Sequence, residues 1–274
     1  MRLRNVIAAF VVATLSLPLA STHAAIIDGL INYYPFDTDA DDNAGTNDGT
    51  LENGATIDNV TTQVGAGSLF LDNVGAGAGP HEYVSRAGVT SGPQPTYSVA
   101  AWINVGSNSG DDQIMSWSKN PSGENLQLRL QGGNLRLGRT PGFSEQTTSG
   151  HPFLLSSTWR HIAVTFDEGA GTEVFLYVDG VERGSGDLTN TSSNDYNTSY
   201  IGAIREGGTL SRSFEGNIDD LGIWDRVLTP AEVTGLFDGS LSLAAVPEPS
   251  TFVLGVCGLL GLLASGRRRN RRRA

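Results

Sequence analysis

The sequence predicts an all-β protein, folded as an antiparallel β-sandwich or jelly roll between residues 26 and 239. Three observations predict this class. Short apolar or alternating runs recur along the stretch, clusters of Gly, Asn, Asp and Ser separate them, and helical periodicity is almost absent. Strands that follow one another without intervening helices favour antiparallel pairing. No internal repeat is evident, so we expect one domain.

The expected strands are spread over the whole stretch, and one of them shows the half-buried pattern clearly. Leu126, Leu128 and Leu130 alternate with Gln127 and Arg129, so the leucines should face the core. In chain order the expected strands are Leu30–Phe36, Ser68–Leu71, Glu82–Ser85, Tyr97–Asn104, Gln113–Ser118, Leu126–Leu130, Asn134–Gly138, Trp159–Phe166, Glu173–Val178, Tyr200–Ile204 and Gly216–Trp224.

Turn and helix signals join these strands. Gly132-Gly133 predicts a tight hairpin after the leucine-rich strand, and Asp179-Gly180 predicts another after Glu173–Val178. Thr229-Pro230-Ala231-Glu232 combines a capping box with proline at the first helical position. It therefore predicts the start of a short helix that reaches Phe237.

The net charge of −11 is an average over regions of opposite character. Eight of the 18 basic residues lie in the terminal segments 1–4 and 267–273, whereas residues 5–245 hold ten basic and 28 acidic residues. This central part is near −18, which argues against a nucleic-acid partner because phosphate binding needs clustered Lys and Arg. Cys257 is the only cysteine, which excludes a disulfide within the chain.

Residues 1–24 predict a secretory signal peptide. Arg2 and Arg4 precede an apolar run from Val6 to Ala20, and Thr22-His23-Ala24 offers small residues for cleavage near Ala24. An N-terminal membrane anchor is the alternative, but the apolar run is short and is broken by Pro18. We therefore expect export.

The C-terminal end divides into a linker (240–249), a hydrophobic segment (250–266) and an Arg-rich tail (267–274). A helix over the hydrophobic segment would rise about 24 Å, which is marginal for a bilayer core of about 30 Å. The positive-inside rule would place the tail in the cytoplasm and the body of the protein outside.

This end also resembles the PEP-CTERM sorting signal of Gram-negative bacteria, which combines a Pro-Glu-Pro motif, an apolar helix and terminal arginines. Here the matching parts are Pro247-Glu248-Pro249, the hydrophobic segment and the arginines that begin with Arg267, Arg268 and Arg269. The resemblance implies an exosortase as processing partner, with cleavage near the motif. It also implies transient anchoring in the inner membrane by the C-terminal helix. Surface display or release would follow, in association with exopolysaccharide or biofilm.

Four segments of the central stretch resemble laminin-G-like, concanavalin A-like lectin domains, in the expected order. They are Leu30–Asp37, Tyr97–Ile103, the hairpin region 159–180 and the closing strand and helix 214–236. The resemblance implies a concanavalin A-like jelly-roll β-sandwich of two antiparallel sheets. It implies much less about function, because this fold carries lectins, adhesins, receptor modules and glycosidases.

Most motif residues of the resemblance have a structural interpretation. Trp102, Trp159, Phe166, Tyr177 and Trp224 alternate on strands and are expected in the core, not as sugar platforms. His161 lies between Arg160 and Ile162, and we expect a packed or hydrogen-bonded strand residue there, not a catalytic base.

The densest acidic stretch is 37–48, in which Asp37, Asp39 and Asp41 alternate. Such oxygen ligands suit calcium, although the stretch lacks the central glycine and the flanking helices of an EF-hand. The resemblance implies a structural Ca²⁺ between the opening loop and the last strand, with Asp37 and Asp219 as first ligands and Asp39 and Asp41 behind them. The alternative is a solvated acidic loop.

No catalytic residue is predicted. The paired carboxylates of laminarinase-like members, a G-x-S-x-G nucleophile motif and a H-E-x-x-H metal motif are all missing from the sequence. The interpretation favoured is a non-catalytic module that binds carbohydrate or extracellular matrix. A structural or adhesive surface protein with protein partners is the alternative, and a polysaccharide hydrolase or lyase comes third. Sugar contacts are expected from exposed rings and amides, with Trp117, Phe143, Asn194, Tyr196 and Asn197 as candidates.

Overall fold

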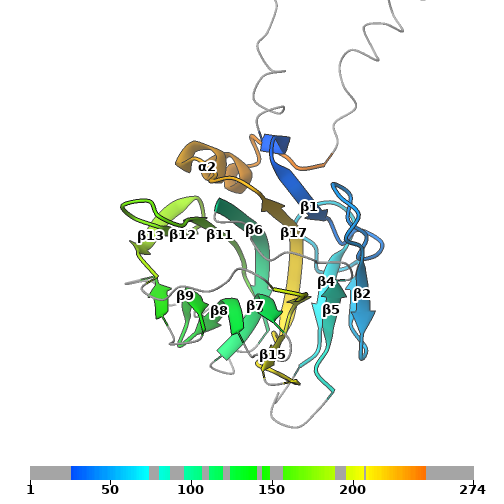
Figure 1. The fold of residues 1–274 in the computed structure, drawn as a ribbon. Coiled ribbons are helices and arrows are strands. Elements are labelled where there is room, and N and C mark those ends of the chain that lie inside the picture. Colours follow the sequence, from blue (N-terminus) through cyan, green and yellow to red (C-terminus); the bar gives the residue numbers. More distant parts are fainter. Residues whose placement is uncertain are drawn as a thin grey trace, which may run out of the picture.

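The computed structural model describes residues 26–73, 80–86, 96–106, 111–119, 124–140, 144–148, 157–188, 196–206 and 208–244. Two large antiparallel sheets, a small two-stranded sheet and a helix account for most of these residues (Figure 1). The predicted signal peptide, the Pro-Glu-Pro motif, the hydrophobic segment and the Arg tail lie outside the described residues, as do Phe143 and Asn194.

The first large sheet has eight strands and is built around β6 and β17. Strand β1 pairs with β17 beside the main path of the sheet. In the order in which they pair, the strands of the main path are β13 (Val181–Gly186), β12 (Val174–Val178), β11 (Trp159–Asp167), β6 (Thr96–Val105), β17 (Gly216–Trp224), β4 (Ser68–Leu71) and β3 (Thr56–Asp58), and β1 spans Leu30–Tyr34.

The second large sheet has seven strands and packs against the first. A two-stranded hairpin, β15 (Ile204–Glu206) and β16 (Thr209–Ser211), follows its strand β14. The paired order of the seven strands is β10 (Ser144–Thr147), β9 (Asn134–Arg139), β8 (Glu124–Gln131), β7 (Asp111–Lys119), β14 (Thr198–Ile201), β5 (Tyr83–Arg86) and β2 (Gly49–Glu52).

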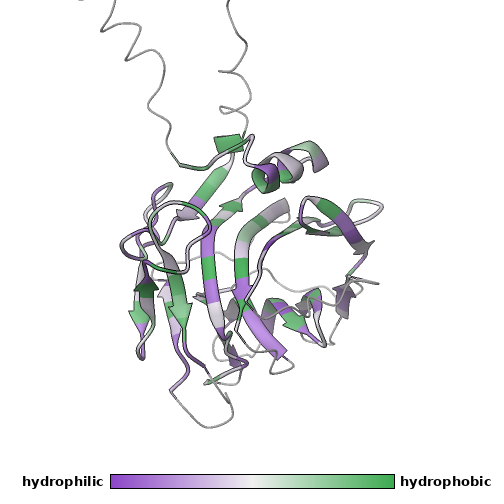
Figure 2. Ribbon diagram, turned by 180° about the vertical axis from the view of Figure 1, so that it is seen from behind, coloured by the Kyte–Doolittle hydropathy of each residue, from purple (hydrophilic) through white to green (hydrophobic). Residues whose placement is uncertain are grey.

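The inner faces of the two sheets form the main core. Apolar and polar residues alternate along the strands, as Figure 2 shows by colour, so each strand turns one face inward. The core buries side chains from both sheets, such as Val99 and Ile162 from the first and Leu128 from the second. This arrangement confirms the predicted all-β sandwich.

A second apolar cluster lies on the outer face of the eight-stranded sheet, beneath helix α2 (Pro230–Asp238). The capping box of Thr229 and Glu232 begins the helix as predicted, and Gly239 ends it with a φ of 76°. Ile26 and Leu243 belong to the same cluster, so the two ends of the described chain lie together at this end of the sandwich (Figure 1).

Two predicted strands end earlier than expected, because a residue with positive φ interrupts each of them. The first strand ends at Tyr34, since Phe36 adopts a φ of 55°. The predicted strand Tyr200–Ile204 ends at Ile201, because Gly202 has a φ of 86° and turns the chain out of the sheet into β15.

In the described part of the chain, no helix is long and apolar enough to cross a membrane.

Candidate functional site

The outer face of the seven-stranded sheet carries polar side chains that are shielded from solvent. On β8 the leucines face the core, as predicted, and Gln127 and Arg129 point outward. Even so, Gln127 is only 1% exposed and Arg129 only 3%. Buried polar groups need partners, so this face must be organised by hydrogen bonds and ion pairs.

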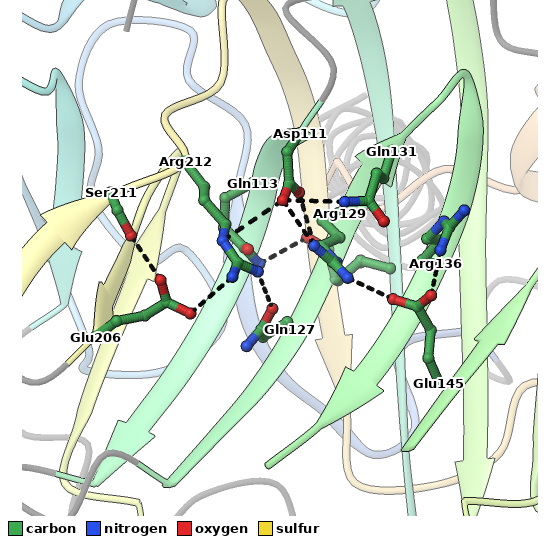
Figure 3. Close-up of polar contacts among 11 residues, drawn as sticks. Asp111, Gln113, Gln127, Arg129, Gln131, Arg136, Glu145, Glu206, Ser211 and Arg212 are labelled. Atoms are coloured by element: carbon green, nitrogen blue, oxygen red, sulfur yellow. Dashed lines mark hydrogen bonds and ion pairs between the residues drawn. The ribbon is translucent and has the colours of Figure 1, made fainter. Parts of the chain in front are cut away.

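An alternating chain of charges runs across this face (Figure 3). We call it the ion network; its members are Glu206, Arg212, Asp111, Arg129, Glu145 and Arg136. Three carboxylates and three guanidinium groups therefore alternate across β15, β7, β8, β10 and β9, together with Arg212 just after β16.

Arg129 is at the centre of the ion network. One of its terminal nitrogens lies 2.8 Å from each carboxylate oxygen of Asp111, and the other lies 2.6 Å from Glu145. Arg136 pairs with the second oxygen of Glu145. Desolvation lowers the pKa of Arg129, but the hydrogen bonds and charges of Glu145 and Asp111 outweigh it and raise the pKa overall. Arg129 therefore stays positively charged although it is buried.

Arg212 links the network to the β15–β16 hairpin. Its guanidinium lies 3.1 Å from Glu206 and 3.5 Å from Asp111, and it donates a hydrogen bond of 2.9 Å to the side-chain oxygen of Gln127. Ser211 donates to the other oxygen of Glu206 at 3.0 Å. The φ of Arg212 is 52°, a strained conformation for a residue with a side chain, which these contacts help to hold.

The chain that leads into the hairpin explains why polar residues beside the network are buried. Ser116 and Ser118 of β7 donate to the carbonyl groups of Ala203 and Arg205, at 2.8 and 3.3 Å. The segment therefore lies across β7. Sequence reasoning missed this cover, although the glycine at position 202 was a signal that the strand ends there.

Part of the network stays open to solvent. The exposed fractions of the side chains are 28% for Asp111, 25% for Arg136, 30% for Arg212 and 36% for Glu206. Gln113 lies beneath them and is fully buried; its amide nitrogen donates to two carbonyl groups, while its side-chain oxygen has no partner among the described residues. The face thus presents hydrogen-bond donors and acceptors that are fixed in position next to one another, which suits a ligand rich in hydroxyl groups.

Two of the predicted sugar-binding rings are not available to a ligand. Trp117 is 3% exposed and Tyr196 is 1% exposed, and both belong to the main core. Trp117 packs against Tyr97, with ring centroids 5.9 Å apart. Asn197 is exposed, and its backbone N–H donates to the carbonyl of Ser118 at 3.1 Å, so it lies at the end of β7.

The predicted structural role of the motif aromatics is confirmed for four of them. Trp102, Phe166, Tyr177 and Trp224 are at most 8% exposed, and Trp159 is half-buried.

His161 is 2% exposed and packs edge-on against Trp102, with ring centroids 5.2 Å apart. Burial lowers its pKa to about 4, although Asp179 opposes the shift. His161 is therefore a packed strand residue, as predicted, and its lowered pKa favours the neutral form at neutral pH.

The predicted calcium ligands fall into two groups. Asp37 and Asp219 both hold the loop that contains residues 63–67, because they accept hydrogen bonds from its backbone. Asp219 accepts from the N–H groups of Gln63 and Val64 at 2.9 Å. Asp37 accepts from the N–H groups of Ala66 and Gly67. Asp39 and Asp41 instead lie in the exposed loop, where the backbone N–H of Asp41 donates to Asp39 at 3.1 Å.

Asp220 is a third carboxylate in the first group, and sequence reasoning missed it. A β-bulge with a φ of 51° at Asp220 turns its side chain toward Tyr33, whose hydroxyl donates to it at 2.5 Å. Burial, and then the charge of Asp220, raise the pKa of Asp219 to about 7, although backbone N–H donors oppose the shift. Burial and the charge of Asp37 likewise raise the pKa of Asp220.

These residues fit a hard cation in part. Asp219 is fully buried, and one of its oxygens has no partner among the described residues. However, no group of three or more His, Cys, Asp or Glu side chains in the described part of the chain is arranged to hold a metal ion. Calcium at Asp37 and Asp219 would therefore need main-chain oxygens or water as further ligands.

Asp42, which was not among the predicted ligands, organises the acidic loop. It is 7% exposed and accepts hydrogen bonds from Asn32, from the backbone of Tyr33 and from three N–H groups of its own loop. These bonds lower its pKa against the effect of burial. The loop is thus held by a carboxylate that faces inward, next to exposed Asp41.

Several proteins of known structure share this fold. The chain is 25% identical to domain 4 of AbnA, a GH43 extracellular arabinanase from Geobacillus stearothermophilus solved in complex with arabinotriose; the TM-score is 0.58, over 76% of this chain and 97% of that domain. No curated protein sequence matches the chain.

Two toxin domains are also similar. The binding domain of Paraclostridial Mosquitocidal Protein 1 is 17% identical, with a TM-score of 0.58 over 78% of this chain and 53% of that one. The ligand-binding domain of botulinum neurotoxin serotype D, in complex with N-acetylneuraminic acid, is 16% identical, with a TM-score of 0.57 over 79% and 52%. At these identities the likeness concerns the fold alone.

The family comparison covers more than half of the sequence. The profile described as the concanavalin A-like lectin/glucanases superfamily matches residues 77–234, which run from before β5 into α2. The chain therefore belongs to the concanavalin A-like lectin/glucanases superfamily.

Proposed function

We propose that this protein is an exported, non-catalytic module that binds carbohydrate through the outer face of its seven-stranded sheet. The observation that carries the proposal is the ion network, in which buried Arg129 holds Asp111 and Glu145 in place while Asp111, Arg136 and Arg212 remain partly open to solvent. Fixed donors and acceptors of this kind can bond neighbouring sugar hydroxyls without first becoming ordered.

The likeness to the arabinanase domain supports this proposal. That domain is 25% identical, and nearly all of it is covered by the present chain. Its structure holds arabinotriose, a short neutral oligosaccharide, so a protein of similar fold and size accommodates a sugar.

Export and processing complete the proposal. The signal peptide would direct the chain across the inner membrane, and an exosortase would process it near Pro247-Glu248-Pro249, to leave the domain on the surface or in the medium. A structural Ca²⁺ at buried Asp219 and half-buried Asp37 would neutralise both carboxylates and stabilise the loop of residues 63–67.

A glycan array probed with the full-length protein, with and without calcium, tests the proposal. We expect binding to at least one class of polysaccharide fragment. Asp111→Asn should weaken that binding about tenfold, because it removes charge-assisted contacts that hold the face. Arg212→Gln leaves the pair of Arg129 and Asp111 intact and should weaken binding as well.

Asp28→Asn is the matched control, since it makes the same change at an exposed residue outside the network. Melting temperatures of all variants separate loss of binding from loss of fold. A wild-type protein that binds no glycan in either condition, or an Asp111→Asn variant that binds as well as wild type, would overturn the proposal.

A further inference from the structure

The charges within the ion network are already balanced. Each of the three guanidinium groups in the ion network has a carboxylate partner: Arg129 has Asp111 and Glu145, Arg136 has Glu145, and Arg212 has Glu206 and Asp111. Three positive charges therefore meet three negative ones, and the network as a whole is neutral.

A negatively charged sugar would find no vacant partner in this network. To pair with Arg136 or Arg212, its carboxylate would have to displace Glu145 or Glu206, or lie beside them as a fourth negative charge. Displacing Glu145 would also remove one partner of Arg129, which is 3% exposed. Breaking a buried ion pair in this way is costly, because it leaves a charge without compensation.

Arg205 is the remaining arginine of the hairpin, and it is engaged with neutral groups. Its guanidinium lies over the ring of Tyr200 at 5.7 Å and donates to the hydroxyl of that ring at 3.1 Å. A second nitrogen donates to the carbonyl of Gly208 at 2.9 Å. Arg205 therefore lies over the ring of Tyr200 and is not a member of the ion network.

The charge of the whole chain acts in the same direction. The protein carries a net charge of −11, and its central part is more acidic still. The long-range field therefore slows the approach of a polyanion, most strongly at low salt.

From this charge balance we propose that the face selects neutral polysaccharides and discriminates against uronic-acid or sialylated ones. The inference rests on the proposed function, because it concerns the ligand class of the same face. In this account Glu145 and Glu206 determine specificity, because they already pair with Arg136 and Arg212, the guanidinium groups that an acidic sugar would need. At the same time their oxygens can accept hydrogen bonds from sugar hydroxyls.

Affinity electrophoresis of the full-length protein tests this inference with two polymers that differ only at C6 of each sugar, namely polygalacturonate, which carries a carboxylate there, and its carboxyl-reduced form, which carries a neutral hydroxymethyl group. Neutral arabinan serves as a further neutral probe. We expect the neutral polymers to retard the protein, with an affinity that changes less than about twofold between about 20 mM and about 500 mM NaCl. Polygalacturonate should bind at least about tenfold more weakly.

Two variants should relax this selectivity. Glu206→Gln, at a side chain that is 36% exposed, leaves Arg212 with one carboxylate fewer. Glu145→Gln does the same to both Arg129 and Arg136. Both variants should raise the affinity for polygalacturonate about two- to fivefold at low salt, the range of a solvent-exposed ion pair. Glu182→Gln makes the same charge change at an exposed position of β13 and should leave the affinities unchanged.

The outcomes separate the two proposals. Equal or tighter binding of polygalacturonate by the wild-type protein would overturn the inference and leave carbohydrate binding intact. Glutamine variants that fold and bind polygalacturonate no better than wild type would overturn the role given to Glu145 and Glu206. A wild-type protein that binds none of the polymers would overturn the proposed function and, with it, this inference.

Discussion

Replacing Asp42 by asparagine should destabilise the domain strongly, whereas the same change at Asp41 should not. Asp42 accepts five hydrogen bonds: from Asn32 at 2.6 Å, from Tyr33 at 2.9 Å and from three loop N–H groups at 3.0 to 3.1 Å. It is 7% exposed, so solvent cannot replace these bonds easily.

The contacts of Asn32 enlarge the effect. Its side-chain oxygen accepts a hydrogen bond of 2.5 Å from buried Arg86, which also donates to the hydroxyl of Tyr34 at 2.8 Å. Hydrogen bonds thus join Arg86 to Asn32 and Asn32 to Asp42, and the carboxylate of Asp42 supplies the negative charge of this chain. Asparagine keeps one acceptor oxygen but puts an NH₂ group against donors and removes the charge.

We expect the free energy of unfolding to fall by about 3 kcal/mol, since hydrogen bonds to a charged acceptor contribute about 1.5–3 kcal/mol each and are not additive. That is a large share of the stability of an ordinary domain. Urea unfolding of the full-length protein in EDTA measures it, with an unchanged m-value as evidence that the same structure unfolds.

Asp41→Asn is the matched control. Asp41 is exposed, and the charges of Asp39 and Asp48 raise its pKa, so its removal should leave stability unchanged or improve it slightly. Equal unfolding midpoints for the Asp42 and Asp41 variants would refute the reasoning, because they would mean that the bonds of Asp42 do not hold the loop.

Three further outcomes follow from the same structure. The pKa of His161 is about 4 in the folded protein and near 6.5 in the unfolded chain, so the unfolded chain takes up the proton first as pH falls. The free energy of unfolding of wild type should therefore be highest above pH 6.5 and fall by about 3 kcal/mol between pH 6.5 and 4. His161→Leu should lack this pH-dependent component when urea unfolding is measured across the same range. Thr229→Ala removes the cap of α2 and should cost about 1 kcal/mol by the same assay, whereas an unchanged midpoint would mean that the cap contributes nothing. Millimolar calcium should raise the melting temperature of wild type and not that of Asp219→Asn, and equal melting in calcium and in EDTA would contradict the metal site.

Local signals predicted much of the sandwich. The alternation of leucines in β8, the glycine turn that follows it and the capping box at Thr229 each depend on residues close together in the chain. Six strands were not among those expected, namely β2, β3, β10, β13, β15 and β16. Five of them have only three or four residues, and β13 has one apolar residue in six, so none shows a clear apolar period.

The candidate site could be predicted only in part, because its geometry depends on distant segments. The alternation in β8 placed Arg129 on the outer face, but its ion-pair partners come from β7 and β10, which lie elsewhere in the sequence. Trp117 was misjudged although it alternates with Ser116 and Ser118, a pattern that favours an inward ring. Asp41 and Asp42 are adjacent and identical in type, so only the fold shows which one turns inward.

The crystal structure of the full-length protein with its tightest-binding neutral oligosaccharide tests the central claim most directly. The account predicts the sugar on the outer face of the seven-stranded sheet, with hydroxyl groups within hydrogen-bond distance of Asp111, Arg136 or Arg212. A sugar bound elsewhere, with the ion network unchanged and remote from it, would contradict the account.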